Sequence, residues 1–450
     1  MCLKKLLEFI ILNVLSNRIG GENMNKEKNL KYPLIFVHGM FGWGEHEGIN
    51  NYIPYWGATS GNITEYMEEL GCEAHAASVG PVSSAWDRAC ELYAQLTGTW
   101  VDYGKAHSEQ RNHKQFGRNY EKPLIENWSA ENKIHLIGHS FGGTTIRMLA
   151  HLLTHGAPEE VEASGANVSP LFKGGKGDWI ASLTAICTPL NGTAAHDTVV
   201  RYKLKNAFRY AAYLYTGALG RTPLNGSLVD FHLEQFGLSN TPGQKDSAPF
   251  ADAVKRLDAS NDQVEYDMGP EGTRLINGRI KISPQIFYFS YPYNAVKESK
   301  SGKHILPSNT KFPFLTFTSA WLAKDIRDHS DEPENVDKLY NDGLVDTFSA
   351  THPHEEPHCL WEETTELRPG VWNVMPITQG DHGSAIGLFE KKDVTQKFYE
   401  DMIELLKKTE YHHLGIEAPQ ENSTTRLQTW LKNEGFSAEK IEECLKYINK

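Results

Sequence analysis

Short apolar runs alternate with amphipathic stretches along most of this chain. The runs Leu34 to Val37 and Ile134 to Ile137 are each followed by a glycine-containing turn, which is typical of buried parallel strands. Further strands are expected at 179–187, 286–290 and 370–377. Apolar positions three or four residues apart predict helices over 63–70, 85–96, 144–153 and 395–407. This alternation predicts an α/β fold with a central, mostly parallel sheet.

The alternation covers residues 31–412, which we expect to form the main body of the protein. Within the body, the stretches 239–273 and 324–341 are polar, charged and interrupted by proline or glycine, as surface loops are. Residues 413–450 predict an appended helical hairpin with its break at Gly435. We expect this hairpin to pack against the body, and the alternative is a role in binding a partner.

Residues 1–30 are expected to be an extension that precedes the body. Two lysines and an apolar run imitate a signal peptide there, but polar residues interrupt the run and no small-residue cleavage site follows. The run is also too short to span a bilayer. The codons for Gly20-Gly21-Glu22 would resemble a ribosome-binding site, so Met24 is the expected natural start. The sequence alone therefore predicts a cytoplasmic location.

Charge and cysteine content exclude two classes of protein. The formal net charge is −12 and the isoelectric point is near 5.9, with no block of Lys and Arg, so nucleic acid is not an expected partner. The six cysteines are scattered and form no CxxC pair, which is too sparse for a disulfide framework in 450 residues. Buried free thiols are expected instead.

The clearest chemical motif is Gly138-His139-Ser140-Phe141-Gly142, which matches G-x-S-x-G between an expected strand and an expected helix. A nucleophilic serine needs such a tight turn, because glycines prevent steric collision there and the helix amino terminus favours negative charge. Ser140 is therefore the expected nucleophile.

A serine hydroxyl needs a base, and in this arrangement an acid and then a histidine follow the serine along the chain. His382 follows the strand expected at 370–377 and is the preferred base. The competing bases His352, His354 and His358 lie in one HPHEEPH segment that resembles a solvated loop, one that could hold a stray transition metal.

Three acidic residues compete to orient the histidine. Asp342 lies in the turn-forming tripeptide Asn341-Asp342-Gly343, forty residues ahead of His382, and is preferred over Asp346. Asp381 directly precedes the histidine and is expected to be exposed to solvent.

Two backbone N–H groups are needed for a developing oxyanion, one after the nucleophile and one in the loop after an early strand. Phe141 and Met40 occupy those places. An ordinary apolar loop residue is the alternative role for Met40.

Several longer motifs stand out, namely HGMFGWG at 38–44, VGPVSSAWDRACELYAQLTG at 79–98, VDYGKAH at 101–107 and FGR at 116–118. Together they resemble the zinc-containing bacterial lipases of the staphylococcal and thermoalkalophilic bacillus type. The resemblance covers most of 31–412 and implies an α/β-hydrolase fold. It also implies the triad Ser140, Asp342 and His382 with oxyanion donors Met40 and Phe141, in agreement with the assignment above.

The resemblance further implies one structural zinc per chain, which pins an extra lobe to the body. Its ligands would be Asp87, His107, His113 and Glu234, the last being a glutamate where the family has an aspartate. Without the family, these residues would be ordinary surface groups. The family often holds calcium after the catalytic histidine, but acidic ligands are absent from the segment that follows His382, so calcium is not expected.

The resemblance also places a helical lid at about 193–220, where aromatic residues are interleaved with or preceded by basic ones. A fixed amphipathic helix is the alternative. The expected activity is lipase action on acylglycerols at an oil–water interface. The alternatives are a carboxylesterase for soluble or polymeric esters and, more remotely, a non-catalytic binding protein of the same fold. Family members are commonly secreted, which conflicts with the cytoplasmic location expected from this chain.

Overall fold

The computed structural model describes residues 29–201, 230–238, 250–300, 305–329, 339–362 and 366–416. At its centre is a seven-stranded sheet of order β11-β12-β7-β6-β5-β1-β2, in which every neighbouring pair is parallel. Its strands are β1 (Leu34–Val37), β2 (Ala74–Ala77), β5 (Ile134–His139), β6 (Ile180–Ile186), β7 (Phe287–Tyr291), β11 (His358–Leu360) and β12 (Trp372–Val374). The predicted α/β fold with a parallel sheet is confirmed.

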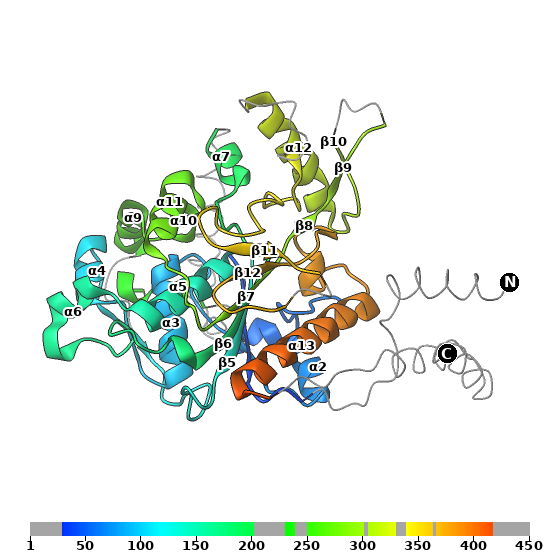
Figure 1. Ribbon diagram of the computed structural model, residues 1–450. Coiled ribbons are helices and arrows are strands. Elements are labelled where there is room, and N and C mark those ends of the chain that lie inside the picture. Colours follow the sequence, from blue (N-terminus) through cyan, green and yellow to red (C-terminus); the bar gives the residue numbers. More distant parts are fainter. Residues whose placement is uncertain are drawn as a thin grey trace, which may run out of the picture.

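Helices cover both faces of the sheet, because side chains alternate between the faces along each strand. In β1, Ile35 and Val37 belong to the hydrophobic cluster formed with α3 (Ala85–Thr97) and α5 (Phe141–His155). Leu34 and Phe36 point the other way, into the cluster formed with α2 (Ile63–Glu69) and α13 (Lys392–Leu414). Figure 1 shows these two helical layers on opposite sides of the strands.

A lobe of short elements extends from the α3 side of the sheet. It contains the helices α4 (Lys105–Arg111), α6 (Pro158–Ser164), α9 (Phe250–Ser260), α10 (Val264–Met268) and α11 (Pro270–Arg279), and the antiparallel pair β3 (Trp100–Asp102) and β4 (Phe116–Asn119). A small cluster of buried apolar residues that includes Phe231, Phe236 and Leu257 packs inside this lobe. The lobe therefore has its own apolar contacts beside the main core.

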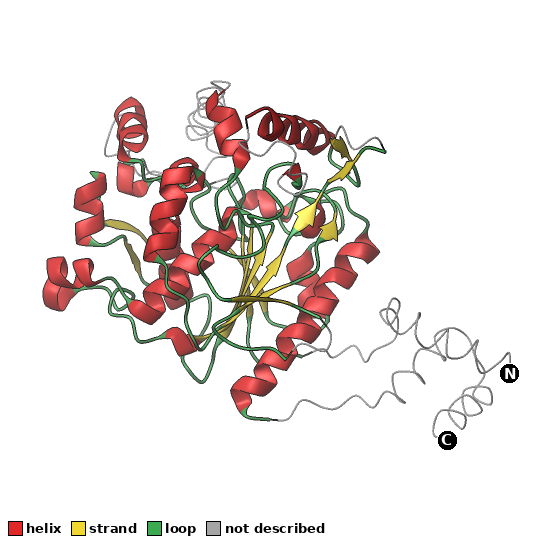
Figure 2. Cartoon of the chain, turned by 45° about the horizontal axis from the view of Figure 1, so that its top comes forward, coloured by secondary structure: helices red, strands yellow, loops and turns green. Residues whose placement is uncertain are grey.

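Two further helices, α7 (Ala194–Arg201) and α12 (Pro313–His329), lie together beyond the carboxyl ends of the central strands (Figures 1 and 2). Thr198 in α7 donates a hydrogen bond of 2.6 Å to the buried carboxylate of Asp325 in α12. Two small pairs complete the described strands: antiparallel β9 (Val296–Glu298) with β10 (Ile305–Pro307), and parallel β8 (Tyr293–Asn294) with β13 (Thr378–Gln379).

The surface loops expected at 239–273 and 324–341 are wrong for 250–260, 264–268, 270–273 and 324–329, which are helical. The first stretch contains α9, α10 and the start of α11, and α12 continues through the second as far as His329. These helices are mostly polar with one apolar side, such as Leu257 packed in the lobe, so their composition resembles that of a loop.

Several expectations fall on residues that lie outside the described ones. They include nearly all of the extension at 1–30, the hairpin helices within 413–450, and the lid at 193–220 beyond α7. Of the cysteines, Cys72, Cys90, Cys187 and Cys359 are described, and none of these four forms a disulfide. None of the described helices is long and apolar enough to cross a membrane.

Candidate active site and metal-ligand cluster

Ser140 occupies a strained turn between β5 and α5. Its backbone has φ 55° and ψ −130°, a combination that a residue other than glycine rarely adopts. The turn fits only because glycines flank it: a Cβ added at Gly142 would lie 2.1 Å from the carbonyl oxygen of Val37. The Ser140 amide donates to the carbonyl of Ile186 over 2.8 Å, which ties the turn to β6. This geometry is that of a nucleophile elbow.

Asp342 and His382 are brought together by two hydrogen bonds. The His382 ring nitrogen Nδ1 lies 2.8 Å from Asp342 Oδ2, and the His382 amide donates to the Asp342 carbonyl, also over 2.8 Å. The second carboxylate oxygen of Asp342 accepts the amides of Leu344 and Val345. With Nδ1–H bound to a fixed carboxylate, Nε2 of His382 is the nitrogen able to accept a proton.

The two rival acids have other partners. Asp346 accepts the amide of Ala194 at the start of α7 over 2.8 Å. Asp381 was expected to be exposed, and this is wrong: it is fully buried, and its carboxylate accepts the amides of Lys311, Phe312 and Gly383 and the hydroxyl of Ser384. Asp381 therefore fixes the loop that carries His382.

The loop of His382 lies against the serine turn. His139, next to the nucleophile, has its Nε2 2.8 Å from the His382 carbonyl oxygen, and the two ring centroids are 4.7 Å apart. Burial, together with the neighbouring His382, holds the pKa of His139 well below its usual range, so its ring is neutral. A neutral ring can donate from Nε2 to that carbonyl and accept the Tyr55 hydroxyl at Nδ1, 2.7 Å away.

Of the competing bases, His352 and His358 stack on each other with ring centroids 3.5 Å apart. Nδ1 of His352 is directed at the Pro353 carbonyl, and Nδ1 of His358 is directed at the Glu356 carbonyl. The His354 amide donates to Asn191. Among these four candidate bases, His382 is the one whose ring is hydrogen-bonded to the Asp342 carboxylate.

The loop that contains Met40 passes directly beside the nucleophile. A Cβ added at Gly39 would lie 2.7 Å from Cβ of Ser140, so only glycine permits this approach. Phe41 has φ 57° and donates its amide to the Pro81 carbonyl, which fixes the loop after Met40. Phe141 is the first residue of α5, where backbone N–H groups have no partner within the helix.

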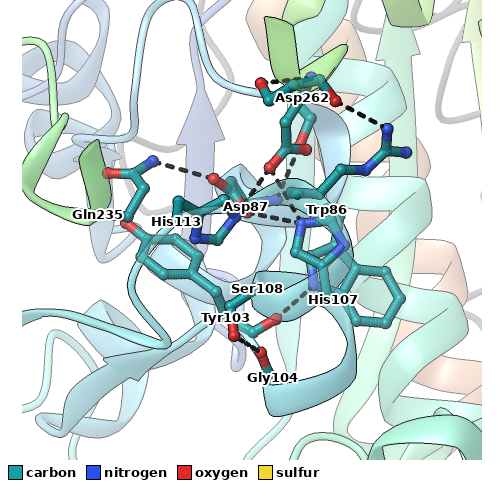
Figure 3. A network of polar contacts seen from close by, with 12 residues as sticks. Trp86, Asp87, Tyr103, Gly104, His107, Ser108, His113, Gln235 and Asp262 are labelled. Carbon is teal, nitrogen blue, oxygen red and sulfur yellow. Dashed lines mark hydrogen bonds and ion pairs between the residues drawn. The ribbon is translucent and has the colours of Figure 1, made fainter. Parts of the chain in front are cut away.

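A second group of titratable side chains lies in the lobe, where Asp87, His107, His113 and Asp262 converge (Figure 3). Nε2 of His107 is 3.1 Å from Asp262 Oδ2 and 3.2 Å from Asp87 Oδ1. Nε2 of His113 is 3.0 Å from the same Asp262 oxygen. Burial opposes protonation of His107, but the carboxylates of Asp262 and Asp87 outweigh it and raise its pKa to about 10.

Outer contacts fix the orientation of these four side chains. The amide of Gln235 donates to Asp87 Oδ2 over 2.9 Å, and Nδ1 of His113 lies 2.8 Å from the Lys114 carbonyl oxygen. The ring of His107 stacks on Trp86 with centroids 5.0 Å apart. Such second contacts typically orient metal-ligating side chains.

The structure corrects the fourth residue of this group. Glu234 lies apart from the cluster, and its carboxylate forms an ion pair with Arg118, as does that of Asp230. Asp262 occupies the expected place of Glu234, from the turn between α9 and α10. The guanidinium of Arg118 holds the Glu234 carboxylate, whereas Gln235, the next residue, is the one that contacts Asp87. Nothing in the local sequence around Asp262 pointed to it.

A parallel sheet with a serine on a strained strand-to-helix turn, followed along the chain by an acid and a histidine that are hydrogen-bonded to each other, defines an α/β-hydrolase.

Comparison with known proteins narrows this class. Residues 30–416 match the family described as "Lipase-like, C-terminal domain", and the chain belongs to that family. It is 35% identical over 381 residues to a lipase of Staphylococcus hyicus, which confirms the resemblance to staphylococcal lipases. That match covers 81% of this chain and 55% of the lipase, so this chain spans about half the length of the curated relatives it matches.

Two solved structures are similar over most of this chain. The crystal structure of S. hyicus lipase aligns with a TM-score of 0.72 and 31% identity, covering 87% of this chain and 99% of that chain. The structure of EstA from Clostridium botulinum aligns with a TM-score of 0.69 and 32% identity, covering 89% and 94%.

Proposed function

We propose that this protein is a serine-dependent carboxylic ester hydrolase that acts as a lipase on acylglycerols. The observation that carries the proposal is the strained elbow at Ser140 beside the loop of the hydrogen-bonded pair Asp342 and His382. The names of the similar staphylococcal proteins support a lipid ester as the substrate class. The phenylalanines Phe314 and Phe317, which are exposed on α12, also suit an apolar substrate surface.

In this mechanism the Ser140 hydroxyl attacks the ester carbonyl carbon while Nε2 of His382 accepts its proton. The carbonyl oxygen becomes an oxyanion, which the amides of Met40 and Phe141 stabilise. Collapse of this intermediate releases the alcohol, which takes the proton from His382, and leaves an acyl group on Ser140. Water then attacks the acyl-enzyme, with His382 again as the base, and releases the carboxylic acid. Asp342 keeps Nδ1–H of His382 oriented throughout.

A fluorophosphonate probe tests the nucleophile, because it phosphonylates only an activated serine. We expect the label on Ser140 in the native protein and its loss after heat denaturation. A native protein that hydrolyses no ester and stays unlabelled would support the non-catalytic binding protein instead. The substrate class is tested separately with esters of increasing acyl length, offered below and above the concentration at which they form an emulsion. Activity that rises at the interface supports a lipase, and equal or lower activity supports the alternative carboxylesterase.

We further propose that Asp87, His107, His113 and Asp262 hold one structural zinc ion. Zinc bonds of about 2.0–2.1 Å imply tetrahedron edges of about 3.3–3.4 Å. Three nitrogen–oxygen distances in the cluster, 3.0, 3.1 and 3.2 Å, are close to that, and the fourth, from His113 Nε2 to Asp87 Oδ1, is 3.9 Å. Asp87 Oδ1 is buried and makes no hydrogen bond of good geometry to the described residues, although His107 Nε2 lies 3.2 Å away, and this suits a cation as its partner.

Two histidines and two carboxylates are a donor set that zinc prefers, and four protein ligands would leave no position for an activated water. The ion would therefore stabilise the lobe rather than act on the ester. We propose no calcium site after His382, because Gly383, Ser384 and Ala385 carry no carboxylate.

A further inference from the structure

Arg88 is an unusual buried cation close to the catalytic centre. It follows Asp87 on α3, and its side chain is fully buried. All three nitrogen atoms of its guanidinium donate hydrogen bonds. Nε donates to the Thr145 hydroxyl over 2.7 Å, one terminal nitrogen donates to the Gly80 carbonyl over 2.8 Å, and the other donates to the His38 carbonyl. The guanidinium therefore joins the end of β1, the loop after β2 and the helix of the nucleophile.

The charge of Arg88 has no counter-ion within ion-pair distance among the described residues, whereas the equally buried Arg147 is paired with Glu356. Burial lowers the pKa of Arg88 to about 10, partly offset by Glu91, so the side chain is still charged at neutral pH. Buried charges are normally paired, because removing an ion from water is costly. A buried cation without a counter-ion would interact favourably with a negative charge that forms nearby.

The first hydrogen-bond route from Arg88 leads to the Met40 amide. Arg88 binds the carbonyl of His38, and Nδ1 of His38 lies 2.8 Å from the carbonyl oxygen of Gly39. That carbonyl belongs to the same peptide unit as the Met40 N–H. It also accepts the Gly42 amide over 3.2 Å. Hydrogen bonds to a peptide oxygen polarise its N–H, so these contacts both position Met40 and strengthen it as a donor.

The second route leads to Phe141. The Thr145 hydroxyl, which accepts from Arg88, donates to the Phe141 carbonyl over 3.1 Å. The Arg88 guanidinium carbon also lies 5.5 Å from the centroid of the Phe141 ring. The Arg88 side chain is thus connected to the backbone at both residues proposed as oxyanion donors, Met40 in the loop after β1 and Phe141 after the nucleophile.

We propose that Arg88 is a positioning residue that sets both backbone donors of the oxyanion hole and places a buried positive charge behind them. The inference rests on the proposed ester hydrolysis at Ser140. Since the oxyanion exists only in the tetrahedral intermediate and the transition states around it, Arg88 acts on kcat rather than on substrate binding.

Replacement of Arg88 by Met, combined with a thionoester substrate, tests this role. In a thionoester the negative charge develops on sulfur, which accepts hydrogen bonds weakly, so an oxyanion hole favours the oxygen ester. In Arg88→Met we expect kcat for the oxygen ester to fall about 100-fold, the loss typical for one oxyanion donor, with little change in KM. The preference for the oxygen ester over the thionoester should fall with it. Arg88→Lys keeps the charge but only some of the hydrogen-bond donors of the guanidinium. Its preference for the oxygen ester should therefore lie between those of Arg88→Met and the native protein.

Two further variants separate positioning from folding. Arg147→Met removes an equally buried arginine on α5, and we expect lower thermal stability with an unchanged preference for the oxygen ester. Thr145→Val removes only the hydroxyl between Arg88 and Phe141, and should lower kcat for the oxygen ester several-fold more than for the thionoester. If Arg88→Met does not fold, Arg88→Lys and Thr145→Val decide the question.

Equal losses on both esters in the folded Arg88 variants, or unchanged kinetics, would overturn the role of Arg88. The failure of ester hydrolysis itself has a different signature: the unmodified protein would hydrolyse neither ester and would not react with fluorophosphonate at Ser140.

Discussion

The two histidine–carboxylate groups of this protein contain the same types of side chain in different arrangements. At the proposed catalytic centre one histidine meets one carboxylate, and the second oxygen of Asp342 is occupied by backbone amides. In the lobe two histidines and two carboxylates direct their ligand atoms at one another within 4.8 Å. The first arrangement leaves one ring nitrogen to exchange protons, and the second is the arrangement proposed to hold a cation.

The supports of the two groups also differ. The proposed catalytic pair, Asp342 and His382, lies on loops after the sheet, where the hydrogen bonds of Asp381 and His139 hold it. The cluster in the lobe draws on α3, α4, the segment after α4, and the turn after α9. A change in the first group should therefore affect the rate of reaction, and a change in the second should affect the stability of the lobe.

The largest expected effect is at the nucleophile. Ser140→Ala should lower kcat for ester hydrolysis by about 10⁶-fold, since the remaining rate comes only from binding and the oxyanion donors. The melting temperature should not fall, because the substitution removes only a hydroxyl group and no packed carbon atom. Steady-state kinetics and calorimetry on the same sample measure both. Near-normal turnover in the folded variant would disprove the mechanism.

A smaller loss is expected at the acid. Asp342→Asn should reduce kcat by about 10⁴-fold, because an amide neither holds the correct tautomer of His382 nor compensates its charge. Asp346→Asn is the matched control and should be far milder, since that carboxylate accepts the Ala194 amide. The reverse ranking in a kinetic assay would transfer the acid role to Asp346.

In the lobe the expected effect is on metal content and stability. Purified protein should contain about one zinc per chain, and the double variant His107→Ala/His113→Ala should contain none. Chelation or the double variant should lower the melting temperature before it affects hydrolysis at low temperature, because structural zinc contributes folding free energy. An unaltered melting curve, or protein without zinc, would reduce the cluster to an ordinary polar network.

The fourth ligand is tested by a pair of variants. Asp262→Asn should weaken zinc binding by at least tenfold, because it replaces a charged ligand with a neutral one. Glu234→Gln should leave zinc binding almost unchanged, since its carboxylate pairs with Arg118. Competition with a chromogenic chelator measures both affinities. Loss of zinc only in Glu234→Gln would restore the ligand set expected from the resemblance.

The smallest expected effect concerns the loop of His382. Asp381→Asn replaces one acceptor oxygen by an NH₂ group and should destabilise the protein by about 1–3 kcal/mol, since backbone amides lose their buried acceptor. Denaturant unfolding measures this change. A variant as stable as the native protein would mean that the loop is held without the Asp381 carboxylate.

Much of the central fold followed from the sequence because its signals are local. The apolar runs at 34–37 and 134–137 are strands, and the helices expected at 63–70, 85–96, 144–153 and 395–407 are present with boundaries shifted by at most seven residues. The elbow at Ser140 needs only glycines at fixed spacing between a strand and a helix. Asp342 and His382 were chosen from turn chemistry and chain order, and the structure joins them by a hydrogen bond.

Other features depended on tertiary structure because their partners are distant in the sequence. Asp262 lies 149 residues after His113 and meets it only when the turn after α9 packs on the lobe. Exposure is expected for Asp381 because it is adjacent to His382 and would have to fold back to reach its ring, yet it is buried because the backbone of 311–312 supplies donors to its carboxylate. Arg88 and the His38 carbonyl are 50 residues apart. Spacing along the chain specifies a turn, whereas convergence of distant groups is decided by how helices and loops pack on the sheet.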